Sequence, residues 1–161
     1  MPVEFKSGNI FVGRTEAIVN AVNCIGVMGK GIALEFKRRW PDYFADYKSR
    51  CKRKSILTGQ VTVYESNNLL AAEEFRYLIS FPTKLHWRTP SKIEFIDTGL
   101  ADLTEKTVEF GIKSMALPAL GCGNGGLDWS EVKPIIQARL STVPDVRFLV
   151  FTPADTPAHQ T

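Results

Sequence analysis

Short apolar runs alternate along this chain with longer segments whose apolar residues recur at helical spacing, and this alternation limits the fold more than any other feature. Val61–Tyr64 is a short run rich in β-branched residues, which is typical of a strand. Ile93, Ile96 and Leu100 recur instead at intervals that place their side chains on one face of a helix. Strands interleaved with helices predict an α/β sandwich with a parallel or mixed sheet.

The boundaries of these elements follow from the apolar patterns and from the glycine and proline residues between them. The expected strands are Val3–Phe5, Ala17–Val22, Val61–Tyr64, Phe75–Phe81, Ser114–Leu117 and Val146–Phe151. The expected helices are Gly31–Arg39, Asp42–Arg50, Ser91–Phe110 and Asp128–Leu140. A length of 161 residues suits one domain, which we expect over residues 1–155, with a frayed tail over 156–161.

Composition excludes several classes of protein. No apolar run is long enough to span a bilayer, and the N-terminal MPVEFKSGN carries charges where a signal peptide needs an apolar core. We therefore expect a cytoplasmic protein with no membrane partner. Three cysteines and two histidines show no spacing typical of a metal site, so we expect reduced thiols, no metal and no cofactor.

The net charge of +3 does not by itself argue for a nucleic-acid partner, but two basic clusters stand out. The cluster from Lys48 to Lys54 is typical of a solvated helix end. The second cluster, Lys84, His86 and Arg88, surrounds Trp87 and is less easily explained in that way.

Two glycine-rich segments follow expected strands and precede expected helices. They are GVMGKGIALEFK from Gly26 to Lys37 and GCGNGGLDW from Gly121 to Trp129. Glycine can turn backbone N–H groups toward one point, and a helix N-terminus adds partial positive charge, so each loop could bind a phosphate. Since ligands of α/β sheets lie beyond the carboxyl ends of strands, both loops could grip one diphosphate. The alternative is that the glycines only make tight turns; neither loop is a Walker or GxGxxG motif.

Three segments together resemble the macrodomain, an ADP-ribose-binding family: AIVNAVNCIGVMGKGIALEFK, FPTKLHWR and LPALGCGNGGLDW. They look most like the DarG-type branch, antitoxins that remove ADP-ribose from DNA modified by a DarT-type toxin. The terminal ADP-ribose protein glycohydrolases are a related branch. The resemblance covers Val3 to Thr152 and implies a three-layer α/β/α fold with a mixed central sheet.

The resemblance also implies a binding site. It places adenine near Asn9 and Ile10, and the distal ribose near Asn23. Asn9 stands where many members carry Asp; its carbonyl can still accept a hydrogen bond, but it lacks the charge. The implied ADP-ribose-binding residues of the two loops are Val27, Met28, Gly29, Lys30, Gly31, Ile32, Ala33, Gly121, Cys122, Gly123, Asn124, Gly125, Gly126 and Leu127. Lys30 could offset phosphate charge or point to solvent.

Cleavage of a glycosidic bond builds positive charge on the sugar carbon, and glycosidases usually meet this with two carboxylates. No convincing carboxylate pair accompanies the loops. Lys84 follows the expected strand Phe75–Phe81, and the resemblance implies that it is the catalytic lysine. A neutral amine could attack the sugar carbon, whereas a charged one could protonate or stabilise the departing base. Both roles remain open at this point.

Other candidate catalytic groups are weaker. Asp128 opens a D-x-x-E pattern with Glu131, which favours a helix cap over a catalytic acid. Cys122 could form a thiolate, but no histidine lies at an obvious pairing position. In the terminal glycohydrolases a second-loop aspartate assists the lysine, and its place here is taken by Gly125. That replacement argues against hydrolysis of protein esters.

The resemblance therefore implies a hydrolase acting on ADP-ribosylated thymidine in single-stranded DNA. A thymine modified on its pairing edge cannot pair, so it is easily extruded. His86, Trp87 and Arg88 could contact DNA, although Trp87 could equally support the loop. The expected partners are ADP-ribose, the modified DNA and a DarT-type toxin, the last through a region absent from this sequence. The alternatives are a non-catalytic ADP-ribose-binding module and a hydrolase of protein-linked or small-molecule ADP-ribose adducts.

Overall fold

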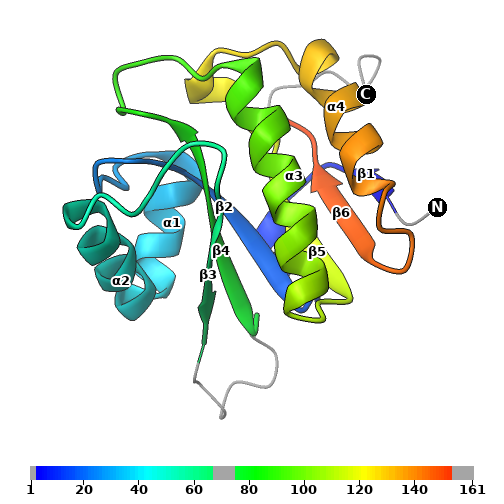
Figure 1. Ribbon diagram of the computed structural model, residues 1–161, viewed down its shortest axis with the longest axis horizontal. Coiled ribbons are helices and arrows are strands. Elements are labelled where there is room, and N and C mark those ends of the chain that lie inside the picture. Colours follow the sequence, from blue (N-terminus) through cyan, green and yellow to red (C-terminus); the bar gives the residue numbers. More distant parts are fainter. Residues whose placement is uncertain (1–2, 67–74, 154–161) are drawn as a thin grey trace.

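The computed structural model of the chain describes residues 3–66 and 75–153, so the expected tail over 156–161 lies outside the described residues. One six-stranded sheet runs through the middle of the molecule in the order β1-β6-β5-β2-β4-β3 (Figure 1). The strands are β1 (Val3–Lys6), β2 (Ala17–Asn23), β3 (Thr62–Glu65), β4 (Tyr77–Lys84), β5 (Ser114–Leu117) and β6 (Arg147–Phe151). All neighbouring strands pair in parallel except β3 with β4, so the sheet is mixed, as expected.

Helices cover both faces of this sheet (Figure 1). The helices are α1 (Gly31–Arg39), α2 (Pro41–Lys52), α3 (Ile93–Glu109) and α4 (Trp129–Leu140). Successive residues of β2 point to opposite faces: Ile18 packs in one buried cluster with residues of α1 and α2, and Val19 in another with residues of α3 and α4. The three-layer α/β/α prediction is confirmed.

The fourth strand is longer than the sequence suggested. It starts at Tyr77 and continues through Pro82 to Lys84, whereas the expected strand ended at Phe81. Proline lacks the amide hydrogen that a ladder requires, so it is rare where a strand is paired on both sides. The ladder with β3 reaches only as far as Ser80, so Pro82 lies beyond it and is paired on the β2 side alone. Lys84 is therefore the last residue of β4 instead of a loop residue.

Two short 3₁₀ turns, Ile10–Val12 (η1) and Gly123–Gly125 (η2), were not expected from the sequence. Helix α2 begins one residue earlier than predicted, with Pro41 in its first turn, where a missing amide hydrogen is harmless. None of the helices in the described part of the chain combines the length and apolarity needed to cross a bilayer.

Candidate active site

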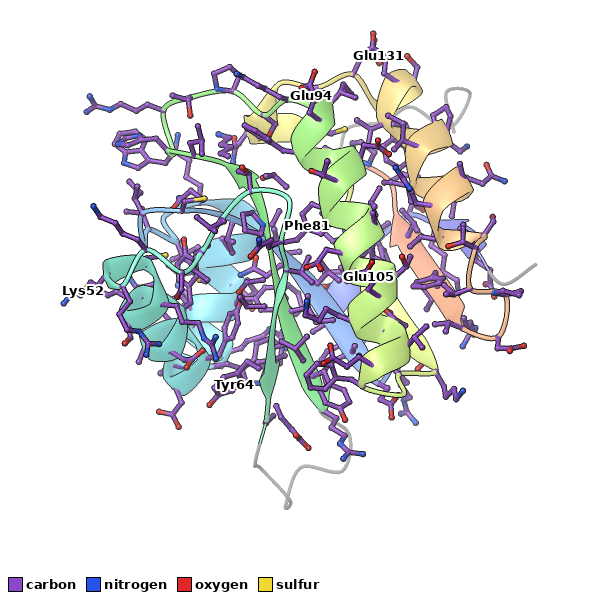
Figure 2. The ribbon with its side chains drawn as sticks, viewed as in Figure 1. Lys52, Tyr64, Phe81, Glu94, Glu105 and Glu131 are labelled. Atoms are coloured by element: carbon purple, nitrogen blue, oxygen red, sulfur yellow. The ribbon has the colours of Figure 1, made fainter. Side chains whose placement is uncertain are left out.

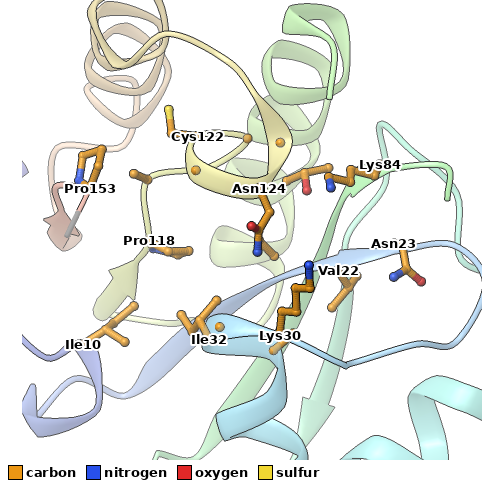
Figure 3. A pocket seen from close by; sticks show the side chains of 18 of the residues that line it. Ile10, Val22, Asn23, Lys30, Ile32, Lys84, Pro118, Cys122, Asn124 and Pro153 are labelled. Atoms are coloured by element: carbon orange, nitrogen blue, oxygen red, sulfur yellow. The ribbon is translucent and has the colours of Figure 1, made fainter. Parts of the chain in front are cut away.

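A cavity of about 880 Å³ opens at the carboxyl ends of the parallel strands. Both glycine loops line it, one from each side (Figure 3). The end of β2 contributes Asn23, the end of β4 contributes Lys84, and the end of β6 contributes Phe151. The prediction that both loops face one crevice is therefore confirmed, because the strands before them are parallel and end at the same edge.

The first loop takes its shape from Asn23. Its side-chain nitrogen donates to the Val27 carbonyl over 2.8 Å, and its Oδ1 accepts from the amides of Ile25 and Val27. The hydroxyl of Tyr47 also donates to Oδ1, at 2.9 Å. An amide carries two N–H donors, so one donor remains for a ligand. Asn23 thus positions the loop first and can offer one hydrogen bond to the cavity.

The first loop ends at the N-terminus of α1, which faces the cavity. Gly31 begins the helix with a φ of +55°, a conformation that favours glycine. Lys30 precedes it and makes no side-chain hydrogen bond to the first-turn amides. The free amide groups of the first turn of α1 and the Lys30 ammonium together give this side of the cavity a positive potential that favours an anion.

The second loop is closed by its own backbone. The amide of Leu127 donates to the Gly121 carbonyl over 3.0 Å, and the amide of Gly126 to the Gly123 carbonyl over 3.1 Å. A Cβ added at Gly121 would lie 2.6 Å from Cδ1 of Leu127, besides requiring a φ of +75°. This loop is therefore a compact turn that only glycine permits.

Gly125 is held by the segment that leads into α3. The amide of Ser91 donates to the Gly125 carbonyl over 2.9 Å, and a Cβ at Gly125 would lie 2.6 Å from the buried Oγ of Ser91. Any side chain at this position would have to displace Ser91. The sequence has glycine at position 125, where the terminal glycohydrolases have an aspartate. The structure shows that the Gly125 backbone lies too close to Ser91 for an aspartate side chain to fit without moving Ser91.

Lys84 projects from the end of β4 into the cavity, which Asn124 of the second loop also lines (Figure 3). Its side chain is half-buried, and its Nζ donates to the Trp87 carbonyl over 3.2 Å. Burial lowers the pKa of the Lys84 amine, and the charge of Lys30 lowers this pKa further. The lining residues, all within the described ranges, include no aspartate or glutamate. The cavity therefore offers amines where a usual glycosidase offers carboxylates.

Neither Cys122 nor Asp128 is suited to catalysis. Burial, with a smaller effect of the Asp128 charge, raises the pKa of the Cys122 thiol to about 11, so the thiol is neutral at physiological pH. Asp128 caps α4, because its Oδ1 accepts from the amide of Ser130 at 3.0 Å and from the Ser130 hydroxyl at 2.9 Å. These bonds lower the pKa of Asp128, which keeps it ionised and unsuited to donate a proton. The predicted helix cap is confirmed, although the amide it binds belongs to Ser130 and not to Glu131.

The comparison with protein families decides the identity of the fold. The family model of the Macro domain matches residues 19–136. The chain belongs to the macrodomain family. The DNA ADP-ribosyl glycohydrolase of Mycobacterium tuberculosis is 45% identical over 152 residues, covering 94% of this chain and 42% of that protein. The enzyme of the same name from Thermus aquaticus is 44% identical, covering 96% of this chain and 42% of that protein.

Solved structures agree with this assignment. The macrodomain of Mycobacterium tuberculosis DarG superposes with a TM-score of 0.90 at 45% identity, covering 94% of this chain and 97% of that one. Thermosipho africanus DarTG in complex with ADP-ribose superposes with a TM-score of 0.90 at 34% identity, covering 96% of this chain and 42% of that one. The chain spans 42% of the length of these DNA ADP-ribosyl glycohydrolases.

Most of the residues that the sequence assigned to ADP-ribose line the cavity of this macrodomain. They are Ile10, Asn23, Val27, Gly29, Lys30, Gly31, Ile32, Ala33, Gly121, Cys122, Gly123, Asn124 and Gly125. Four others do not line it. Asn9 instead accepts a 2.9 Å bond from the Phe11 amide, Met28 is buried beneath the first loop, and Gly126 and Leu127 close the second loop from behind. Their contact with a ligand stays a prediction.

The cavity also has lining residues that sequence analysis missed. They are Gly8, Ala21, Val22, Thr83, Pro118, Ala119, Phe151, Thr152 and Pro153. Several directly follow β5 and β6, so the rule that ligands lie beyond strand ends could have found them. Pro153 and Ile10 mark the end of the cavity opposite Lys84 (Figure 3).

The loop after β4 forms the rim of the cavity beside Lys84. Trp87 lines the cavity and is 45% exposed. The guanidinium of Arg88 lies 4.6 Å from the centroid of the Trp87 ring, and the His86 ring centroid lies 5.4 Å away. His86 and Arg88 do not line the cavity themselves. His86 and Arg88 instead flank the exposed indole of Trp87. Their contact with DNA stays a prediction.

Replacing Asp128 by alanine should lower the thermal stability of this macrodomain without lowering its turnover. The change removes the side-chain cap of α4, and we expect Tm to fall by roughly 2–4 °C, measured by calorimetry. Asp128→Asn keeps a capping oxygen and should restore most of the loss. A large loss of turnover in both variants, with normal folding, would instead make Asp128 a catalytic group.

Proposed function

We propose that this macrodomain hydrolyses the bond between ADP-ribose and thymidine bases of single-stranded DNA, and thereby reverses a DarT-type toxin. The observation that carries the proposal is Lys84, a half-buried amine with a lowered pKa in a cavity of about 880 Å³ whose lining residues include no carboxylate. Relatives at 44% and 45% identity that bear the name DNA ADP-ribosyl glycohydrolase support it.

In the proposed complex the two glycine loops hold the diphosphate from opposite sides. Adenosine occupies the end near Ile10 and Phe151, and the distal ribose lies against Lys84. If Lys84 is neutral, its nitrogen attacks C1, and the thymine nitrogen leaves with the bonding electrons and takes the proton that the attacking nitrogen loses; water then displaces Lys84 from C1 and returns that nitrogen to the free amine. If Lys84 is charged, it donates its proton to the departing thymine while water attacks C1, and the proton lost by this water restores the Lys84 ammonium. Burial, and to a smaller extent the charge of Lys30, lower the pKa of Lys84, which favours its neutral form relative to that of an ordinary lysine.

The experiment that tests the function compares two substrates side by side. One is an oligonucleotide carrying ADP-ribosylated thymidine, and the other is a peptide carrying ADP-ribosylated glutamate. We expect rapid release from the DNA and release from glutamate at least about tenfold slower, since no acid stands at Gly125. Tight ADP-ribose binding without release from either substrate would make the chain a binding module. Release from glutamate alone would overturn the DNA substrate.

The Lys30 charge should shift the pH range in which Lys84 works, in addition to the larger effect of burial. Replacing Lys30 by glutamine removes a cation that lowers the pKa of Lys84, so this pKa should rise. The limb of the kcat–pH profile that reports Lys84 should therefore move to higher pH. If the acidic limb moves, the neutral amine is the active form; if the alkaline limb moves, the ammonium is. Lys30→Arg keeps the charge and should leave the profile in place. An unmoved profile in Lys30→Gln would remove Lys30 from this role.

A toxin partner is part of the same proposal. A Thermosipho africanus protein that is 34% identical over 160 residues bears the name DNA ADP-ribosyl transferase-DNA ADP-ribosyl glycohydrolase fusion protein. The matched part covers 41% of that protein. We propose that this macrodomain likewise works beside a DarT-type transferase in the cytoplasm, where its DNA substrate would be found.

A further inference from the structure

Three segments distant in sequence form one surface beside Lys84. They are the loop of residues 24–27 after β2, the C-terminal end of α2 with residues 48–54, and the loop of residues 85–88 after β4. The amide of Cys24 donates to the Leu85 carbonyl over 3.3 Å, which joins the two loops. Gly26 packs on α2, where an added Cβ would lie 3.6 Å from both Cys51 Cβ and Lys48 Cγ. We call this surface the basic rim; Figure 2 shows Lys52 at its outer edge.

The basic rim carries positive charge without compensating acids. The sequence has no acidic residue between Asp46 and Glu65, and none from Asn23 to Leu34 or from Phe75 to Ile93. Arg50 is neutralised by Asp46 at 2.8 Å. Lys48, Lys52 and the two cations that follow are exposed, and within the described residues no salt bridge engages them. Since the whole chain has a net charge of only +3, this concentration attracts a polyanion to one face.

The end of α2 places one of these cations in an unfavourable backbone conformation. Lys54 follows the helix with a φ of +57°, and it is the one non-glycine residue of positive φ in the described ranges. Glycine or asparagine usually stands at such a helix end, because a Cβ is strained there. A lysine at this position costs stability, which is consistent with a use for its charge.

Exposed apolar side chains lie between these cations and Lys84. Eight large apolar side chains are exposed in the described part of the chain, and four of them lie on the two loops of the basic rim. They are Ile25 at 44%, Val27 at 40%, Leu85 at 52% and Trp87 at 45% exposure. Apolar and aromatic groups beside a row of lysines match single-stranded DNA, whose bases are unpaired and whose phosphates are regularly spaced. Duplex DNA would offer the phosphates but not the base faces.

We propose that the basic rim is the path of the DNA strand on one side of the modified nucleotide. The strand's phosphates lie along Lys48 and Lys52, and its unpaired bases lie against Ile25 and Leu85. The inference rests on the proposed function, since it takes Lys84 as the point at which the modified base meets the site. It identifies the cluster from Lys48 to Lys54, which the sequence suggested was only a solvated helix end, as part of the substrate-binding surface.

The test measures binding of an unmodified fluorescent oligothymidylate by anisotropy at several salt concentrations. Lys48→Glu/Lys52→Glu should weaken binding by about tenfold or more and reduce the slope of log K against log salt by about 1.4, for two phosphate contacts on a single strand. Arg38→Glu/Lys113→Glu changes the net charge equally, at exposed positions outside the rim, and should change neither quantity much. Equal losses in both double variants, or no loss in the first, would overturn the proposal.

Two further arms make the result specific. Ile25→Ser/Leu85→Ser should weaken oligothymidylate binding several-fold with the salt slope unchanged, because it removes base contacts and no charge. Calorimetric affinity for free ADP-ribose should be unchanged in Lys48→Glu/Lys52→Glu; a parallel loss there would mean a disturbed fold and overturn the assignment. The assay uses unmodified DNA, so it does not depend on hydrolysis. If these effects are seen but no ADP-ribose is released from DNA, the basic rim is a DNA-binding surface and the proposed hydrolase function is wrong.

Discussion

Lys84→Ala should abolish turnover while leaving the affinity for free ADP-ribose within about twofold of the original. Lys84 is the amine that projects from β4 into the cavity, and no lining carboxylate in the described chain could replace it. Loss of one acid–base or nucleophilic group lowers kcat by roughly a hundredfold to ten-thousandfold. The diphosphate is expected to be held by the two loops, which Lys84 does not shape, so binding should survive. Single-turnover release from ADP-ribosylated oligonucleotide measures the first quantity, and calorimetry the second.

Two companion variants make the result interpretable. Lys113→Ala removes an exposed lysine that does not line the cavity and should have full activity. Lys84→Arg keeps a cation that cannot lose its proton, so it retains partial activity only if the charged form assists the leaving thymine. Full turnover in Lys84→Ala would exclude Lys84 from the mechanism. A parallel loss of ADP-ribose affinity would show that Lys84 binds the ligand instead.

Gly123→Val should weaken ADP-ribose binding by at least about tenfold. Gly123 has a φ of +73° and lines the cavity at the start of the short turn that faces α1. A β-branched side chain disfavours this conformation by about 1–2 kcal/mol or more, so the second loop should rearrange. The backbone that would cradle one phosphate is then lost, and calorimetric titration with ADP-ribose measures the effect.

The matched control for this change is Gly111→Val. Gly111 has a φ of +65° with no atom within 4 Å of an added Cβ, and it lies outside the cavity after α3. Its substitution should lower Tm while leaving the dissociation constant for ADP-ribose unchanged. Gly123→Asn should weaken binding less than Gly123→Val, because asparagine tolerates positive φ. Equal affinities in Gly123→Val and the unaltered chain would contradict the assignment of this loop to phosphate.

Much of the fold could be predicted because its elements depend on local patterns. The β-branched residues of β2 and β3 mark strands, and the Asp128 cap marks the start of α4, as the structure confirms. The extension of β4 could not be predicted. Proline is normally excluded from the interior of a sheet. Pro82 is tolerated in β4 because pairing with β3 ends at Ser80, so the missing amide hydrogen breaks no bond on that side.

Some residues of the candidate site could likewise be predicted from the sequence, and others could not. The two glycine loops were found because glycine limits which backbone conformations and ligand contacts are available there. Lys84 was singled out by the resemblance to the macrodomain family, since a lysine after a strand is by itself an ordinary surface residue. The cavity end formed by Phe151 and Pro153 was missed, because nothing in those residues alone distinguishes a ligand contact from an ordinary strand end. The distinction depends on the order in which the strands lie side by side.

Local conformations follow from the amino-acid sequence: where helices and strands lie, which turns require glycine, and which side chains carry reactive groups. Burial and proximity depend on how the strands and helices pack. Lys30 lies near enough to Lys84 to lower its pKa, Ser91 closes the space at Gly125, and the end of α2 joins the rim of the cavity. Conformational preferences act between neighbours in the chain, whereas desolvation, charge interaction and steric exclusion act through space. They therefore become defined only when the strands and helices have packed together.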